Sequence, residues 1–378
     1  MRAILLGGGL ALLISLLGTR TAIHLFTNWG YGQEIRDDGP TTHHTKRGTP
    51  TMGGVVIILA TVIAYFAAKL ITQSMPSASA LLLLFLFVGM GLVGFLDDFI
   101  KISKQRSLGL RSKAKMIGQT VIGVVFGILA LSPALEDGRG KTPASDHISF
   151  IRDFDKFTVP AVVLILLFWL IITGTSNAVN LTDGLDGLAT GASVMVFGAY
   201  TLVNIWQNNQ SCAISPSGTC YEVRDPLDLA VIASAITGAC FGFLWWNASP
   251  ARIFMGDTGS LSLGAALAGL AILTRTELLL IILGGLFVME TVSVMMQVSF
   301  FKLTKGRRIF RMTPIHHHFE MLGWEQITVV IRFWIITGLC VATGWASSTP
   351  SGWPAREPRP PRPARLLEGV RAVVAGFG

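Results

Sequence analysis

Long apolar runs separated by short polar stretches fill the first 347 residues of the chain. A helix needs about 20 mainly apolar residues to cross the hydrocarbon core of a bilayer. The runs at 185–205 and 259–274 fit least well, because the first begins in a polar motif and the second is short, although its Gly and Ala residues suit close helix packing. The pattern predicts an all-α, polytopic membrane protein with about ten transmembrane helices, at residues 3–23, 53–72, 80–99, 115–133, 158–177, 185–205, 229–246, 259–274, 278–300 and 328–347.

Basic residues predict how these helices are oriented. Lys and Arg concentrate in the loops after the first, third and ninth predicted helices. With ten helices these loops share one side of the membrane, and the positive-inside rule makes that side cytoplasmic. Both termini are then expected outside. Residues 1–347 form the expected transmembrane domain, and the Pro- and Arg-rich residues 348–378 are expected to be a disordered tail.

The composition agrees with a membrane protein. Only 14% of the 378 residues are charged and 51% are hydrophobic, whereas about a quarter of the residues in soluble domains are charged. The net charge of +8 lies in short loops rather than on a basic amphipathic helix. We therefore expect lipid headgroups, and no nucleic acid, as partners of these loops. Cys212 and Cys220 flank a polar loop, where a disulfide and two free thiols are equally expected if the loop faces outward.

Candidate chemistry gathers on the predicted cytoplasmic side. Asp97 and Asp98 end the third predicted helix, where adjacent carboxylates are costly so close to hydrocarbon. Their mutual repulsion makes one of them a candidate general base. Lys101 lies about one helical turn further on and can reach the same phosphate or carboxylate.

Amides and carboxylates recur at every third position in NAVNLTDGLDGLA, residues 177–189. On a helical turn, side chains three residues apart lie on one face. The spacing therefore predicts that Asn177, Asn180, Asp183 and Asp186 come together at the membrane surface.

Asp257 stands between two glycines in RIFMGDTGSLSLG, just before the eighth predicted helix. The N-terminus of that helix would offer free N–H groups and a positive dipole to a phosphate. Asp257 would add an oxygen ligand for a hard cation. Beside the other acidic motifs, this segment predicts a metal and phosphate site.

Three consecutive histidines, His316, His317 and His318, stand in PIHHHFE. Consecutive side chains point in different directions in a helix or a strand, which argues against a zinc site. We expect one or two of them to contact phosphate or to transfer a proton.

Lys46 lies among Gly, Thr and Pro residues in the segment 37–54, which suits an anion-binding loop. Carboxylates without thiolate partners favour Mg²⁺ or Mn²⁺ over zinc, and basic loops suit a diphosphate. The residues alone therefore predict metal-assisted phosphoryl transfer at the cytoplasmic surface of the membrane.

Together these motifs resemble the phospho-N-acetylmuramoyl-pentapeptide-transferase family, within the polyprenyl-phosphate N-acetyl-hexosamine 1-phosphate transferase superfamily. DD-x-x-K, NLTDGLDGL and GDTGS are typical of the superfamily, whereas RGTPTMGG and PIHHHFE point to the muramoyl-pentapeptide branch. The resemblance implies a bacterial plasma-membrane enzyme that uses Mg²⁺. Its substrates would be UDP-N-acetylmuramoyl-pentapeptide and undecaprenyl phosphate, and its products lipid I and UMP. The number of subunits stays open, with a homodimer as one arrangement.

The resemblance also implies roles for individual residues. Asp257 would be the main magnesium ligand, and Asp98 the base that deprotonates the lipid phosphate, with Asp97 beside it. Either Lys113 or Lys115 would be the catalytic-site lysine, and we favour Lys115.

The remaining roles concern the donor. Phe254 would stack on uracil, His317 would contact the donor phosphate or sugar, and Glu290 is a candidate because it is an acid within a predicted membrane helix. Our candidate catalytic residues are Asp97, Asp98, Lys101, Lys113, Lys115 and His317. Our candidate substrate-binding residues are Lys46, Asn177, Asn180, Asp183, Asp186, Phe254, Glu290, His316 and His318.

Several alternatives stay open. The lipid phosphate could attack the donor directly, or Asp97 or Asp98 could first form an aspartyl-phosphate. A sister enzyme that uses UDP-N-acetylglucosamine is the nearest rival. An ion-coupled transporter is more remote, because its polar groups should lie near the middle of the membrane rather than at one face.

Overall fold

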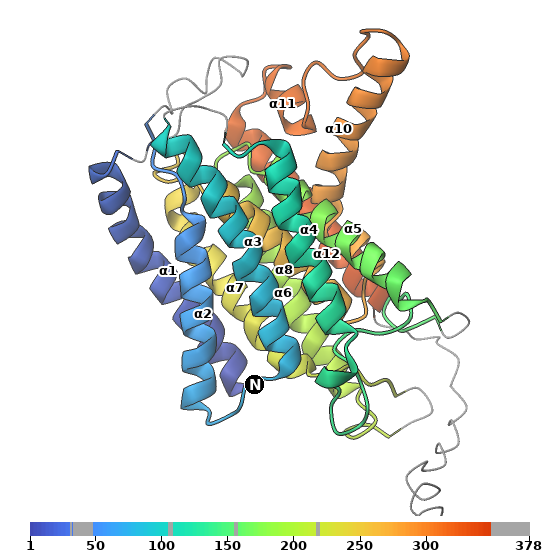
Figure 1. Cartoon of the computed structure of the whole chain (residues 1–378). Helices are drawn as coiled ribbons and strands as arrows, with labels where there is room; N and C mark the ends of the chain where they lie inside the picture. Colours follow the sequence, from blue (N-terminus) through green and yellow to red (C-terminus); the bar gives the residue numbers. More distant parts are fainter. Residues whose placement is uncertain (31, 33–47, 105–108, 155–157, 217–219, 349–378) are drawn as a thin grey trace, which may run out of the picture.

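The computed structural model describes residues 1–30, 32, 48–104, 109–154, 158–216 and 220–348 (Figure 1). In these ranges ten helices are long and apolar enough to cross a membrane and no strand is formed, so the all-α, ten-helix prediction is confirmed. Lys46 and the predicted tail from residue 349 onward lie outside the described residues. The ten helices are α1 (Arg2–Asn28), α2 (Gly54–Ile71), α3 (Ala78–Ser103), α4 (Ser112–Ala130), α5 (Ala161–Thr182), α6 (Leu188–Asn209), α7 (Pro226–Asn247), α8 (Gly256–Leu273), α10 (Gly285–Leu303) and α12 (Gln326–Ser348).

Helix α8 lies at the centre of the bundle (Figure 1), and all its residues from Thr258 to Leu273 are buried. It packs against α2, α3 and α5. Two glycines allow the closest approaches: a Cβ on Gly54 would overlap the backbone of Gly259, and a Cβ on Gly94 would overlap the carbonyl group of Asp257. Small residues permit such backbone contacts in membrane bundles. They bring the N-terminus of α8 against the C-terminal end of α3.

The prediction of one continuous ninth helix at 278–300 is wrong. The chain forms a short helix, α9 (Leu279–Leu283), and then α10, with Gly284 between them. Gly284 and Gly285 favour a break because glycine is a poor helix former. Helix α10 leans away from the bundle toward its C-terminal end (Figure 1). Its exposed face carries Val292, Met295 and Met296, as expected for contact with lipid.

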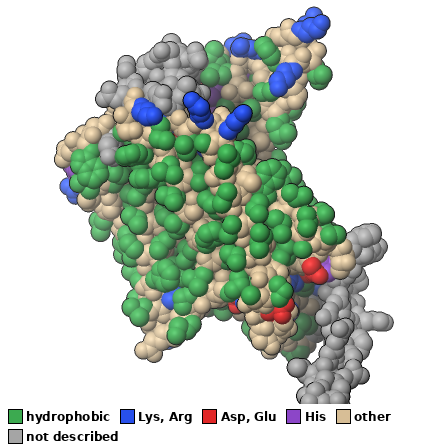
Figure 2. All heavy atoms as spheres, viewed as in Figure 1, with side chains coloured by type: hydrophobic (Ala, Val, Ile, Leu, Met, Phe, Trp, Pro, Cys, Tyr) green, Lys and Arg blue, Asp and Glu red, His purple; other side chains and the backbone are tan. Residues whose placement is uncertain are grey.

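The two ends of the bundle differ in charge. Figure 2 shows hydrophobic side chains over the flank and Lys and Arg side chains at the end where α10 and the short helix α11 (Ile315–Glu320) project. The loops after α1, α3, α5, α7 and α10 share this end, because each crossing reverses the chain. The N-terminus and the end of α12 share the other. Cys212 and Cys220, in the α6–α7 loop at that other end, form a disulfide.

Glu277 is a buried carboxyl between α8 and α9, outside the spanning helices. It accepts a hydrogen bond from the Ser149 backbone N–H (3.2 Å), beside the ion pair of Arg275 and Asp153 (2.9 Å). Burial raises the pKa of Glu277 to about 8, and the negative charge of Asp153 acts in the same direction, against the Ser149 N–H and Arg275.

Protein stability is therefore expected to fall as the pH rises from 4.5 to about 8. An ordinary Glu has a pKa of 4.5, so between pH 4.5 and about 8 the folded protein binds a proton that the unfolded chain releases. We expect the melting temperature in detergent to fall between these pH values, and Glu277→Gln to flatten the fall. The control is Glu136→Gln, which changes an exposed carboxylate near the same end of the bundle. An unchanged pH dependence in Glu277→Gln would contradict the assignment.

Candidate active site

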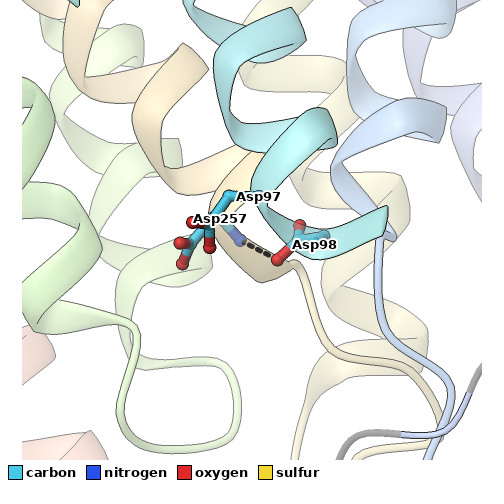
Figure 3. Close-up of side chains that lie close together, drawn as sticks. All are labelled: Asp97, Asp98 and Asp257. Carbon is cyan, nitrogen blue, oxygen red and sulfur yellow. Dashed lines mark hydrogen bonds between the residues drawn. The ribbon is translucent and has the colours of Figure 1, made fainter. Parts of the chain in front are cut away.

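Three carboxylates meet where α3 ends and α8 begins (Figure 3). Asp97 and Asp98 come from the last turns of α3 and Asp257 from the first turn of α8. Carboxylate oxygens of the three residues lie within 4.8 Å of one another. Asp97 and Asp98 are each only 3% exposed. The structure therefore gathers residues that are about 160 positions apart in sequence, as the acidic motifs predicted.

Two lysines border this acidic cluster. The Lys101 Nζ lies 2.6 Å from an oxygen of Asp97 and 3.0 Å from an oxygen of Asp257. The Lys115 Nζ, from the first turn of α4, donates to the same Asp257 oxygen at 2.7 Å. Lys113 is exposed. Of the two lysines that the sequence left open, the structure brings Lys115 to the site.

The carboxylate of Asp98 holds the N-terminus of α8. It accepts hydrogen bonds from the backbone N–H groups of Asp257 (3.2 Å) and Thr258 (2.9 Å) and from the Thr258 hydroxyl (2.8 Å). Gly256 suits this position for two reasons. Its φ of +73° lies in the region that favours glycine, and a Cβ there would lie 2.6 Å from an Asp98 oxygen. The N–H groups of Asp257 and Thr258 that we expected to bind phosphate therefore already have a protein acceptor.

The side chains of the 177–189 motif contact different partners. Asn180, near the end of α5, donates to Asp257 (2.7 Å) and to Ser260 (2.8 Å). Asn177 lies one turn earlier and donates to Gln119 and to the Thr173 carbonyl, away from the acidic cluster. The predicted common face thus does not include Asn177.

Asp183 and Asp186 follow the end of α5. Asp186 is buried and accepts from the Ala251 N–H (3.1 Å), so it holds the loop between α7 and α8. Asp183 is half-buried. Burial, and then the negative charges of Asp257, Asp98 and Asp186, raise the pKa of Asp183 well above its usual range.

Phe254 lies three residues before Asp257, on a loop that pairs with the segment leading into α2. Its N–H donates to the Pro50 carbonyl (2.8 Å), and its carbonyl accepts from the Gly53 N–H (2.9 Å). Phe254 is half-buried. Sequence reasoning missed this pairing of the TPTMGG and IFMGD segments, because nothing local to either predicts its partner.

The three histidines point to three different partners, as their consecutive positions predicted. His316 is fully buried, with its Nδ1 3.1 Å from a carboxyl oxygen of Glu290. The His317 Nδ1 lies 2.7 Å from Glu320. His318 accepts a hydrogen bond from the Arg311 N–H at 3.1 Å. The histidines therefore do not converge on one metal position.

A hard divalent cation fits the acidic cluster better than a soft one. Within the part of the chain that the structure describes, Asp97, Asp98 and Asp257 form the group that could hold a metal, and all its donor atoms are carboxylate oxygens. Such oxygens suit Mg²⁺, which takes one or two carboxylates and completes its shell with phosphate oxygens and water.

Comparison with known proteins shows the family. The family model "Glycosyl transferase family 4" matches residues 80–275, and the model "Phospho-N-acetylmuramoyl-pentapeptide-transferase signature 1" matches residues 46–58. A phospho-N-acetylmuramoyl-pentapeptide-transferase of a Nocardioides species is 79% identical over 352 residues, covering 91% of this chain and 97% of that protein. The chain belongs to the phospho-N-acetylmuramoyl-pentapeptide-transferase family.

Other family members are less similar but cover the chain to about the same extent. The phospho-N-acetylmuramoyl-pentapeptide-transferase of Streptomyces avermitilis is 59% identical, with 94% of this chain and 100% of that protein covered. That of Cutibacterium acnes is 60% identical, with 91% and 97% covered. The acidic cluster and both lysines lie within the range of the glycosyl transferase model, whereas the histidines lie beyond it.

Proposed function

We propose that the chain transfers phospho-N-acetylmuramoyl-pentapeptide from UDP-N-acetylmuramoyl-pentapeptide to undecaprenyl phosphate, which yields lipid I and UMP. One observation carries this proposal beyond family membership. Asp97, Asp98 and Asp257 meet Lys101 and Lys115 at one end of a ten-helix bundle. Such a cluster can bind a cation and a diphosphate together at the surface of the membrane.

The donor diphosphate would lie against this cluster. Asp257 is the proposed main Mg²⁺ ligand, oriented by Asn180, with Asp97 next to it. Mg²⁺ held there would neutralise charge on the diphosphate and its transition state. Lys101 and Lys115 are positioned to contact phosphate oxygens.

The rest of the donor would extend over the neighbouring loops. Phe254 would stack on uracil and His317 would contact phosphate or sugar. Asp183, directly after the end of α5, stays a candidate for donor contacts. Asp186 holds the α7–α8 loop that carries Phe254. His318 and Lys46 stay candidates for donor contacts.

An apolar cavity of about 380 Å³ supports a lipid acceptor. It lies between α5, α8, α9 and α10 and is lined by Gly174, Ala178, Leu267, Phe287 and Val288, among others. Ala178 stands only two residues before Asn180, so the cavity approaches the acidic cluster. A prenyl chain in the cavity would place its phosphate near the donor, and burial of its methylene groups would favour binding.

The proposed chemistry is an in-line displacement at the β-phosphorus of the donor. A bond forms between an oxygen of the lipid phosphate and this phosphorus, the bond to the α-phosphate oxygen breaks, and UMP leaves. Asp98, with Asp97 beside it, is the candidate base that removes a proton from the lipid phosphate. The covalent route through an aspartyl-phosphate on either residue stays the alternative.

The site end of the bundle is proposed to face the cytoplasm. The Lys and Arg side chains at that end favour this orientation under the positive-inside rule (Figure 2). It would also place the site where a soluble nucleotide donor is available. A homodimer stays a proposal.

The purified chain, with undecaprenyl phosphate and Mg²⁺ in detergent, is expected to release UMP from UDP-N-acetylmuramoyl-pentapeptide. UDP-N-acetylglucosamine under the same conditions is the matched donor and should react much more slowly. A preference for UDP-N-acetylglucosamine would replace the muramoyl assignment with the sister enzyme. Turnover without any ion gradient would exclude transport as the sole activity.

A further inference from the structure

Glu290 and His316 form a buried pair of ionisable side chains outside the acidic cluster. Both are 0% exposed, and a carboxyl oxygen of Glu290 lies 3.1 Å from the Nδ1 of His316. Among the described residues, neither the carboxyl oxygens of Glu290 nor the ring nitrogens of His316 form a hydrogen bond, so the two groups meet only at ion-pair distance. Glu290 lies on the spanning helix α10, where an ionisable group is costly unless it has a partner and a role.

The opposite edge of the His316 ring contacts the turn that follows α5. A Cβ on Gly184 would overlap the Nε2 of His316 and would lie 3.4 Å from the Nε2 of His317. The His316 and His317 rings are 4.1 Å apart between centroids. The imidazole of His316 therefore lies between Glu290 on one side and Gly184 on the other.

Helix α10 also contributes to the acceptor cavity. Phe287, Val288 and Thr291, from the turns of α10 around Glu290, line this cavity. Helix α10 thus borders the proposed acceptor cavity. Through Glu290 and His316 it also reaches the turn at residues 183–187, beside the proposed donor position.

We infer that Glu290 and His316 are a positioning pair that fixes the 183–187 turn and His317 against α10 in the geometry that the sugar-nucleotide donor requires. Glu290 acts through His316 and touches no substrate, because it is fully buried. The inference rests on the proposed function. It assigns a role to an ionisable pair at α10 that the acidic cluster does not explain.

The test compares Glu290→Leu with Glu290→Gln in the UMP-release assay. Glu290→Leu removes the polar group that lies 3.1 Å from the His316 Nδ1, so we expect the KM for the donor to rise about tenfold while kcat changes less than about threefold. Glu290→Gln keeps a polar side chain of nearly the same shape beside the His316 Nδ1, so its donor KM should stay within about threefold of wild type. A donor KM within about twofold of wild type in Glu290→Leu, or a loss in kcat alone, would overturn the inference.

A second variant and a matched control separate positioning from stability. Gly184→Ala disturbs the other edge of the His316 ring and should raise the donor KM as well, which keeps the test available if Glu290→Leu does not fold. Lys69→Met breaks another buried ion pair, Lys69–Asp228 (3.0 Å), at the opposite end of the bundle. It should lower the melting temperature without changing the donor KM. An equal rise in KM in Lys69→Met, or an unchanged KM in Gly184→Ala, would count against the pair.

The two proposals fail differently. If the wild-type chain does not use the muramoyl donor, the proposed function is wrong, and the positioning role for that donor falls with it. If the wild type is active and the Glu290 and Gly184 variants keep the wild-type donor KM, only the positioning role is wrong.

Discussion

Asp257→Ala is expected to lower the kcat for UMP release at least about a hundredfold, the scale of losing a metal ligand. Asp257 is the residue on which the site converges: one oxygen accepts from Asn180, and the other from Lys101 and Lys115. Removing this carboxylate would leave the ammonium groups of Lys101 and Lys115 next to each other without the anion that binds both. The proposed Mg²⁺ ligand would be lost at the same time.

The measurement is kcat across a Mg²⁺ titration, with the melting temperature in parallel. Asp257→Asn keeps the shape and the hydrogen bond from Asn180 but removes the charge, so it should lose activity with little change in fold. Asp146→Ala removes a carboxylate that is 69% exposed, at the other end of the bundle, and should retain wild-type activity. If Asp257→Ala kept more than about a tenth of the wild-type kcat, Asp257 would not be the principal metal ligand.

The ten helices were predictable because the tendency to cross a bilayer is a local property of composition and length. Even the short, Gly- and Ala-rich run at 259–274 proved to be a helix, α8, and its small residues are what allow α2, α3 and α5 to surround it. The break at Gly284 was less visible. Its flanking residues are as apolar as those of any span, and hydropathy carries no information about helix direction.

The acidic site was predictable to the level of its motifs. With ten crossings, the ends of the third and fifth helices and the start of the eighth must share one end of the bundle. Which side chains then meet depends on the rotation of each helix about its axis. Lys115 reaches Asp257 whereas Lys113 is exposed, and Asn180 reaches it whereas Asn177 turns toward Gln119. Contacts between residues far apart in sequence are not specified by any local pattern.

Asp98 shows the same limit most clearly. The adjacent carboxylates at a helix end predicted a base at Asp97 or Asp98, and the family resemblance implied Asp98. The structure shows that its oxygens accept three hydrogen bonds from Asp257 and Thr258 on another helix. Capping across helices cannot be read from the sequence, because capping rules relate residues within a few positions of one helix.

Asp98→Asn is expected to lower kcat at least about a hundredfold, and two physical causes predict this loss. If Asp98 is the base, the amide cannot take a proton from the lipid phosphate. If Asp98 is mainly the cap of α8, the amide places an NH₂ group against donors that need an acceptor, and Asp257 moves from its position. The first cause acts on chemistry alone, and the second also lowers stability.

Three measurements separate these causes. Asp97→Asn leaves the cap intact, so a comparable loss there would shift the base assignment to Asp97. Thr258→Ala removes one of the three donors to Asp98 without changing any carboxylate; a loss of about tenfold or more would favour the capping role. Incubation of the wild type with the donor alone tests the covalent route, because a trapped phospho-enzyme would exclude direct attack. Full activity in Asp98→Asn would refute both roles, because the base and the cap both depend on the carboxylate that this substitution removes.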